Sequence, residues 1–161
     1  MDIANINGKA WDGEVENNNW WTRIVSQESI DEARKGNPGI WVTPSSNVPL
    51  SWIEPLKGKK VLNACGGGGQ QTPLLSAYGA LVTVIDISKK QLEQDRIALD
   101  KYSLDAEIVH GSVLSLPFED ESFDHIINPC SLNFIEDLDG VYSQFYRVLR
   151  KGGSLIFGIS N

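Results

Sequence analysis

Four consecutive glycines, Gly66–Gly69, constrain the fold of this chain more than any other feature of its sequence. Val61 and Leu62 come shortly before them and predict a buried β-strand, and the stretch from Gln70 to Tyr78 predicts a helix directly after them. Glycine has no Cβ atom, so it permits positive φ angles and lets a ligand approach the main chain closely. This order predicts a nucleotide-like ligand at the carboxyl end of a parallel strand, beside free amides at a helix N-terminus.

From residue 59 onward, strand and helix patterns alternate, which is typical of a parallel sheet with helices on its faces. Strands are expected at Lys60–Ala64, Leu81–Ile85, Ala106–His110, Phe123–Ile127 and Ser154–Ile159. Ser88, with Gln91 three residues later, predicts the start of a helix that runs toward Lys101. The apolar residues from Leu138 to Leu149 recur at helical spacing and predict an amphipathic helix. We therefore expect an α/β fold.

The first 58 residues differ in kind from the rest of the chain. They hold all five tryptophans, which are Trp11, Trp20, Trp21, Trp41 and Trp52. One helix is expected from Gln27 to Lys35, with Ser26 as its N-cap. We interpret residues 1–58 as a tryptophan-rich appendage to a core of residues 59–161. Two roles stay open for the indoles: packing between appendage and sheet, which is favoured because tryptophan is usually packed, or a lid that shields a ligand from water.

The composition excludes several classes of protein. The chain has 161 residues, of which 41% are hydrophobic, and no run of eighteen apolar residues, so we expect one globular domain and no membrane span. Its net charge of −7 offers no electrostatic footprint for nucleic acid. The start lacks the pattern of a secretion signal, so we expect a cytoplasmic protein whose partners are small molecules. Cys65 and Cys130 are too few for a disulfide scaffold and are not spaced as metal ligands, so we expect inert thiols and no metal site.

An acidic residue at the end of the second strand narrows the choice of ligand. Asp86 follows the glycines by about 20 residues, where a carboxylate accepts hydrogen bonds from the ribose hydroxyls of an adenosine. On spacing alone, a dinucleotide and an adenosine sulfonium compound both fit. The dinucleotide pattern has a third glycine, however, and Thr72 stands at that position here. The dinucleotide alternative is thereby weakened.

These motifs resemble those of the class I S-adenosylmethionine-dependent methyltransferases. Residues 61–69 match the first motif of that family, Asp86 matches its ribose-binding acid, and residues 111–118 match the segment that holds the adenine. The fourth strand, residues 122–127, and the passage from the last helix into the fifth strand, residues 145–153, match as well.

The N-terminal appendage belongs to the resemblance too. A bacterial subgroup of the family shares the Gly-Gly-Gly-Gln-Gln run of Gly67–Gln71, the Trp11-Asp12 pair and the Thr43-Pro44 pair.

The resemblance implies a Rossmann-like, doubly wound parallel sheet with strand order 3-2-1-4-5, in a chain that stops before the family's usual sixth and seventh strands. It also implies transfer of a methyl group from S-adenosylmethionine to a small-molecule acceptor. The cofactor-binding residues carried over from the family are Asn63, Gly67, Gly69, Asp86, Ser112, Val113 and Asn128.

Three positions depart from the family pattern. Asn63 replaces an acid that helps to fix the amino-acid end of the cofactor, Ser112 replaces the aspartate that meets the adenine amino group, and Cys65 replaces the first glycine. An amide keeps hydrogen-bonding capacity but gives up the charge that suits an ammonium group. Asn128-Pro129 resembles part of the acceptor site of amino methyltransferases, although a strand-ending turn is the favoured interpretation.

The sequence does not identify catalytic residues. His125 lies inside a predicted strand and is expected to be a hydrogen-bonded core residue, and His110 ends the strand on the adenine side. The apolar fifth strand would form an exposed edge that favours a homodimer. Besides a methyltransferase, two alternatives stay open: an NAD-binding module, and a fragment that binds the methyl donor without turnover.

Overall fold

The computed structural model describes residues 3–43 and 46–159, and its centre is a five-stranded parallel sheet. The strands are β3 (Lys60–Ala64), β4 (Leu81–Asp86), β5 (Glu107–His110), β6 (Phe123–Asn128) and β7 (Leu149–Phe157). They lie in the order β5-β4-β3-β6-β7, which is 3-2-1-4-5 when the parallel strands alone are numbered, so the predicted Rossmann-like topology is confirmed. β4 and β5 are added on one side of β3, and β6 and β7 on the other side. The strand order therefore reverses between β3 and β6, and ligands of such sheets bind at the carboxyl ends of these two strands.

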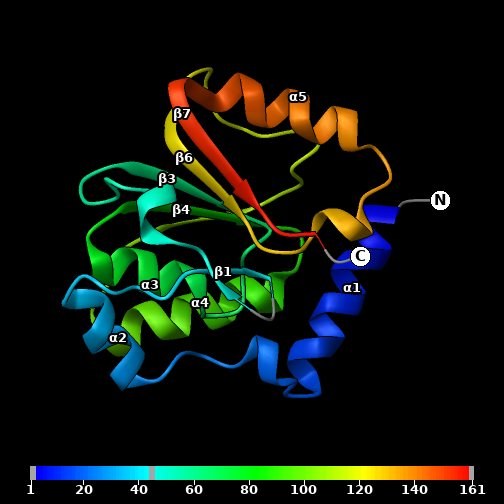
Figure 1. Cartoon of the computed structure of the whole chain (residues 1–161). Coiled ribbons are helices and arrows are strands. Elements are labelled where there is room, and N and C mark those ends of the chain that lie inside the picture. The colour runs from blue at the N-terminus through cyan, green and yellow to red at the C-terminus, as the bar shows by residue number, and fades with distance from the viewer. Residues whose placement is uncertain (1–2, 44–45, 160–161) are drawn as a thin grey trace.

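Helices cover both faces of the sheet (Figure 1). The helices on one face are α3 (Gln71–Tyr78) and α4 (Lys89–Tyr102), and the helix on the other is α5 (Leu138–Val148). Successive side chains of β3 pack against the helices on opposite faces of the sheet, because side chains alternate along a strand. Val61 joins an apolar cluster that includes Leu74 of α3, and Leu62 joins one that includes Phe145 of α5. Among residues 3–43 and 46–159, none of the helices combines the length and the hydropathy that a membrane span requires.

Local signals set several helix ends as predicted. Ser88 caps α4, because its hydroxyl accepts a hydrogen bond from Gln91 N at 3.1 Å. Ser26 caps α2 (Gln27–Arg34) in the same way. Gly79 ends α3 at a φ of 104°, a left-handed conformation that favours glycine.

The fifth strand begins earlier than the glycines after α5 suggested. It starts at Leu149, directly after α5, rather than at Ser154. Phe123 of β6 pairs with Leu149, whereas His125, two residues on, already pairs with Ser154. β7 has extra residues between these two pairs, and they form an irregular part of the strand. The sequence did not reveal this part, because residues 150–153 resemble the end of a helix. Among the described residues β7 is the outermost strand on its side, and a homodimer through it stays a prediction.

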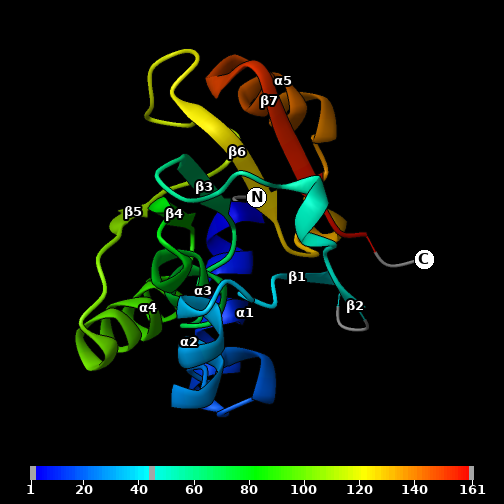
Figure 2. The same cartoon turned by 60° about the vertical axis from the view of Figure 1, so that its left-hand side comes forward.

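The N-terminal segment packs beside α3 and α4 (Figure 2). It contains α1 (Ile3–Glu16), α2, and a small antiparallel sheet of β1 (Trp41–Thr43) and β2 (Ser46–Asn47). Its aliphatic side chains, including Ile30, Ile40 and Leu56, join the apolar cluster that covers the α3 face of the sheet. The division of the chain at residue 58 stays a prediction, and Pro44 of the Thr43-Pro44 pair lies outside the described residues.

The indoles do not fill the space between this segment and the sheet, so the favoured packing role is wrong for most of them. Trp20, Trp21, Trp41 and Trp52 keep between 41% and 65% of their surface exposed. The space is filled by smaller branched side chains instead, which leaves the indoles at the surface.

α1 stands across the carboxyl edge of the sheet and is held there by polar contacts (Figures 1 and 2). Asp12 Oδ1 accepts hydrogen bonds from Ser88 Oγ at 2.7 Å and from Lys90 N at 3.0 Å, so α1 supplies a second cap for α4. Asn7 Nδ2 donates to Phe134 O at 2.9 Å. α1 therefore bridges the segments that follow β4 and β6.

The glycine loop lies directly against α4. Gly68 N donates to Gln91 O at 3.0 Å, and Gly69 N donates to Asp95 Oδ1 at 3.0 Å. A Cβ atom on Gly67 would lie 2.8 Å from the Cβ atom of Gln91, which is closer than two such atoms approach. The glycines are thus required by the contact with α4.

Asp95 is the buried acid beneath this loop. Burial raises the pKa of its carboxyl to about 8, although hydrogen bonds from the Gly69 amide and the Thr72 hydroxyl act in the opposite direction. In the unfolded chain the same group titrates near its ordinary pKa of about 4. The folded chain therefore holds a proton that the unfolded chain has lost across this range of pH.

The first prediction concerns pH. Because the pKa of Asp95 is raised on folding, its contribution to stability is complete below about pH 4 and is lost as the pH rises to about 8. Asp86, with a pKa raised to about 6, acts in the same direction but only up to about pH 6. Asp95→Asn keeps an oxygen acceptor for Gly69 and is expected to flatten the fall in stability between about pH 6 and pH 8. Urea unfolding of both proteins across this range measures it, and equal slopes would contradict the assignment.

The second prediction concerns the attachment of α1. Asp12→Ala is expected to lower the free energy of unfolding by about 1–2 kcal/mol, because it removes two hydrogen bonds and a negative charge at the N-terminus of α4. Glu16→Ala is the matched control, since Glu16 forms an exposed ion pair with Lys90 between the same two helices and such pairs contribute about 0–1 kcal/mol. Urea unfolding compares the two variants, and a loss in Asp12→Ala no larger than in the control would show that this cap is not what holds α1.

Candidate functional site

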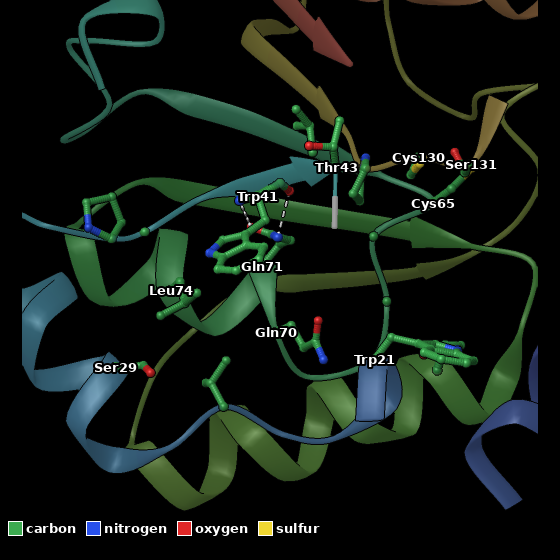
Figure 3. A pocket seen from close by; sticks show the side chains of 18 of the residues that line it. Trp21, Ser29, Trp41, Thr43, Cys65, Gln70, Gln71, Leu74, Cys130 and Ser131 are labelled. Atoms are coloured by element: carbon green, nitrogen blue, oxygen red, sulfur yellow. Dashed lines mark hydrogen bonds between the residues drawn. The ribbon is translucent and has the colours of Figure 1, made fainter. Parts of the chain in front are cut away.

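A cleft of about 780 Å³ opens at the carboxyl ends of β3, β4 and β6 (Figure 3). Cys65, Gly66 and Gly67 border it after β3, Asp86 borders it at the end of β4, and residues 129–131 border it after β6. The N-terminal segment supplies much of the remaining wall. The cleft thus lies where parallel sheets of this topology bind ligands.

Asp86 is the buried carboxylate of the cleft. Its Oδ1 accepts a hydrogen bond from Ser88 N at 2.9 Å, and its Oδ2 accepts one from Gly67 N at 3.2 Å. Burial raises its pKa to about 6, while the backbone amides that donate to it lower the pKa and the nearby charge of Asp12 raises it. A carboxylate has about four lone-pair positions, so Asp86 keeps capacity to accept hydrogen bonds from ligand hydroxyls.

Three of the four amides of the glycine loop, those of Gly67, Gly68 and Gly69, are not free, which corrects the expectation from the sequence at these positions. They donate to acceptors of the chain itself, which are the Asp86 carboxylate for Gly67, the Gln91 carbonyl for Gly68 and the Asp95 carboxyl group for Gly69. The reason is the close packing of the loop on α4, which places acceptors opposite these donors. A bound phosphate needs such amides for itself, so the loop is poorly suited to a pyrophosphate.

Two predicted site residues, Asn63 and Asn128, lie beneath the cleft. Both are fully buried. Asn63 Nδ2 donates to Gly66 O at 2.9 Å, and Asn128 Nδ2 donates to Ala64 O at 2.8 Å and to Ser131 Oγ at 2.7 Å. Each amide therefore shapes a loop that borders the cleft.

The other predicted residues divide between the cleft and its surroundings. Gly67 and Asp86 line the cleft together. Gly69 is buried against α4, Val113 is buried in the apolar cluster on the α5 face, and the Ser112 hydroxyl accepts a hydrogen bond from the amide two residues later. The cofactor-binding roles of all seven residues stay predictions.

The histidines lie outside the cleft wall. His125 is buried, with Nδ1 2.7 Å from Ser154 Oγ and Nε2 3.3 Å from Pro55 O, which confirms the predicted hydrogen-bonded core histidine. His110 is exposed at the end of β5.

The two cysteines do line the cleft, at the ends of neighbouring strands. Cys65 and Cys130 adopt φ angles of 54° and 49°, a left-handed conformation that strains residues other than glycine. Burial, and then the charge of Asp86, raises the pKa of the Cys65 thiol to about 12. The Cys65 thiol therefore stays protonated near neutral pH, as expected of an inert thiol.

Sequence reasoning missed the role of the two glutamines after the glycine loop. Gln71 makes two hydrogen bonds with the backbone of Trp41, accepting from Trp41 N at 3.3 Å and donating to Trp41 O at 2.7 Å (Figure 3). Gln70 Nε2 donates toward Trp20 O at 3.3 Å and Arg23 O at 3.2 Å. The signal in the sequence was their position directly after the glycines, which placed them beside the cleft.

Aromatic and acidic side chains dominate the wall from the N-terminal segment. Four tryptophans line the cleft, which are Trp11, Trp20, Trp21 and Trp41. The charged side chains of the lining are Glu28, Glu32 and Asp86, and none of the described residues that line the cleft is basic. Four of the five indoles thus line the cleft, which is where a lid over a ligand would place them. That they shield a ligand from water stays a prediction.

Comparison with known proteins gives a consistent result. Residues 62–157 match the family model described as a methyltransferase domain. The chain is 49% identical, over 156 residues, to the uncharacterized methyltransferase YbaJ of Bacillus subtilis, and the match covers 96% of this chain and 61% of YbaJ. The crystal structure of the PH0226 protein of Pyrococcus horikoshii is similar with a TM-score of 0.62 and 31% identity, covering 65% of this chain and 47% of that one.

A third similar structure is that of a Methanococcus maripaludis protein assigned to the S-adenosyl-L-methionine-dependent methyltransferases. It has a TM-score of 0.61 at 20% identity, and the match covers 100% of this chain and 67% of that one, which supports the fold. The chain thus spans 61% of the length of YbaJ and 47% of the PH0226 chain. The family model covers more than half of the chain, and on this ground the chain belongs to the class I S-adenosylmethionine-dependent methyltransferases.

Proposed function

We propose that the protein binds S-adenosylmethionine in the cleft and transfers its methyl group to a small-molecule acceptor. The observation that carries the proposal is the pattern of charge and donors around the glycine loop. Three loop amides already donate to acceptors of the chain, and the charged side chains of the cleft lining are acidic. Such a cleft suits a ligand with positive sulfonium and ammonium groups better than one with phosphates.

The residues of the cleft also fit the uncharged part of this cofactor. Asp86 has oxygen lone pairs left for the two ribose hydroxyls after accepting from the backbone. Gln91 Oε1 is a buried acceptor without a hydrogen-bond partner among the described residues, and Gln91 also lines the cleft. Asp86 Oδ2 lies beside Gly67 and Gln91 Oε1 lies beside Gly68, so both acceptors flank the glycine loop, where they are suited to hydroxyl and amino donors.

Bound S-adenosylmethionine supplies an electrophilic methyl group on a positive sulfur. The chain itself contributes the positioning of the reactants and the removal of water. Asp86 and the loop around Gly67 hold one end of the cleft, and α1, through Trp11, closes part of its side.

An NAD-binding module is disfavoured by the same geometry. Thr72, at the position of the third glycine of a dinucleotide motif, is fully buried and accepts a hydrogen bond from Asn63 Nδ2 at 3.0 Å.

The proposal includes a cytoplasmic location, which the free thiols of Cys65 and Cys130 support, because such thiols persist in reducing compartments.

The third prediction tests the cofactor site by calorimetric titration with S-adenosylhomocysteine. Asp86→Ala is expected to weaken binding by about 1–3 kcal/mol, or roughly 5- to 150-fold, because it removes the acceptor of the ribose hydroxyls. Wild-type affinity is expected to rise as the pH increases through about 6, because the ionised carboxylate is the better acceptor.

Asp100→Ala is the control, since Asp100 is exposed on α4 and lies outside the cleft lining. An unchanged affinity in Asp86→Ala would remove Asp86 from the site. Binding of NAD without binding of S-adenosylhomocysteine would overturn the proposed function itself.

A further inference from the structure

The geometry points to an acceptor pocket between the N-terminal tryptophans and the glycine loop, built for an apolar, ring-bearing acceptor that carries no negative charge. This inference rests on the proposed function and deepens it by naming the class of acceptor. In Figure 3 the side chains of Trp41 and Leu74 lie on one side of the pocket and Trp21 lies on the other. Cys65, Cys130 and Ser131 lie at its inner end, close to the strand ends.

The indoles of this pocket are accessible, although hydrogen bonds hold the backbone of Trp20 and Trp41. Trp20 is 58% exposed, Trp21 41% and Trp41 42%. Large apolar side chains that gather at a cleft while remaining exposed mark a binding surface. A ligand ring would bury these faces, and contacts between aromatic rings stabilise such a complex beyond the burial of apolar area alone.

Gln70 and Gln71 act as positioning residues for these walls. Gln71 pairs with both backbone groups of Trp41, and Gln70 donates to the turn that carries Trp20 and Trp21. Both glutamines directly follow the glycine loop in the sequence. The distance from the aromatic walls to the glycine loop is therefore set by side chains at the start of α3, the helix that follows this loop. The same residues thus fix the position of the acceptor relative to the cofactor.

The charges of the cleft decide which ring-bearing molecules fit. Glu28 and Glu32 of α2 line the cleft together with Asp86 at the end of β4, whereas none of the described lining residues is basic. Glu32 pairs with Lys35, at 2.8 Å, outside the lining. A carboxylate or phosphate on the acceptor would meet like charges without a neutralising partner, while a hydroxyl or amino group would not.

The fourth prediction uses three probes that share one ring system and differ in charge. These are 1-naphthalenemethanol, 1-naphthylmethylamine and 1-naphthoate, titrated by calorimetry into protein saturated with S-adenosylhomocysteine. The alcohol and the amine are expected to bind at least about 10-fold more tightly than the carboxylate. Equal binding of the carboxylate would overturn the inference, and so would the absence of binding by all three.

Variants separate the pocket from a general effect on the fold. Trp41→Ala and Gln71→Met are expected to weaken binding of the alcohol about 5-fold or more, because the first removes a wall and the second removes both hydrogen bonds that hold it. Trp52→Ala is the matched control, since Trp52 is 65% exposed and lies outside the cleft lining. Unchanged binding of the alcohol in both pocket variants would overturn the inference.

Binding of S-adenosylhomocysteine is measured in every variant and shows that its loop is folded. Failure of the wild type to bind S-adenosylhomocysteine defeats the proposed function. Failure to bind the probes, by a wild type that binds S-adenosylhomocysteine, defeats the acceptor pocket alone.

Discussion

The close contact between the glycine loop and α4 is the constraint on which the rest of the site depends. Side chains at Gly67 and Gly69 would collide with the helix, and the amides of Gly67, Gly68 and Gly69 donate to acceptors on α4 or on Asp86, shortly before α4. The N-terminus of α4 is held in turn by Asp12 of α1. The glycine loop, the Asp86 carboxylate and α1 are therefore all positioned by their contacts with α4 or with its N-terminus.

A buried polar network supports the loop from below. Asn63 donates to both Gly66 O and Thr72 Oγ1, and the Thr72 hydroxyl interacts in turn with Asp95. An ionised carboxylate at position 63 would present acceptors alone to the Gly66 carbonyl, whereas the amide supplies donors. The asparagine that departs from the family motif and the threonine at the third glycine position thus form parts of one arrangement. The loop is built on internal hydrogen bonds rather than on a bound phosphate.

The N-terminal segment contributes to the cleft as much as the sheet does. It shares an aliphatic cluster with α3 and the sheet, so its backbone is anchored by burial, while its indoles remain accessible at the cleft. Gln70 and Gln71 connect these two roles, because they extend from the end of the glycine loop to the backbone of the tryptophan-bearing segments. The result is an aromatic and acidic wall that faces the carboxyl ends of the strands.

The sequence alone was enough to predict the order of strands and helices from residue 59 onward, several helix caps and the place of Asp86, because strand periodicity, capping and glycine turns are signals between near neighbours. It did not reveal α1, since among the residues of that helix, all of them described, Gly8 alone is buried and an apolar stripe is missing. Nothing in the sequence pattern marked Asp95 as a buried acid, and the tryptophans were expected to pack between the N-terminal segment and the sheet. Packing in three dimensions set which backbone amides of the glycine loop have acceptors, which indoles are exposed and which side-chain amides lie beneath the cleft. Those outcomes depend on segments far apart in the chain, and the partner of a polar group is set only when such segments pack together.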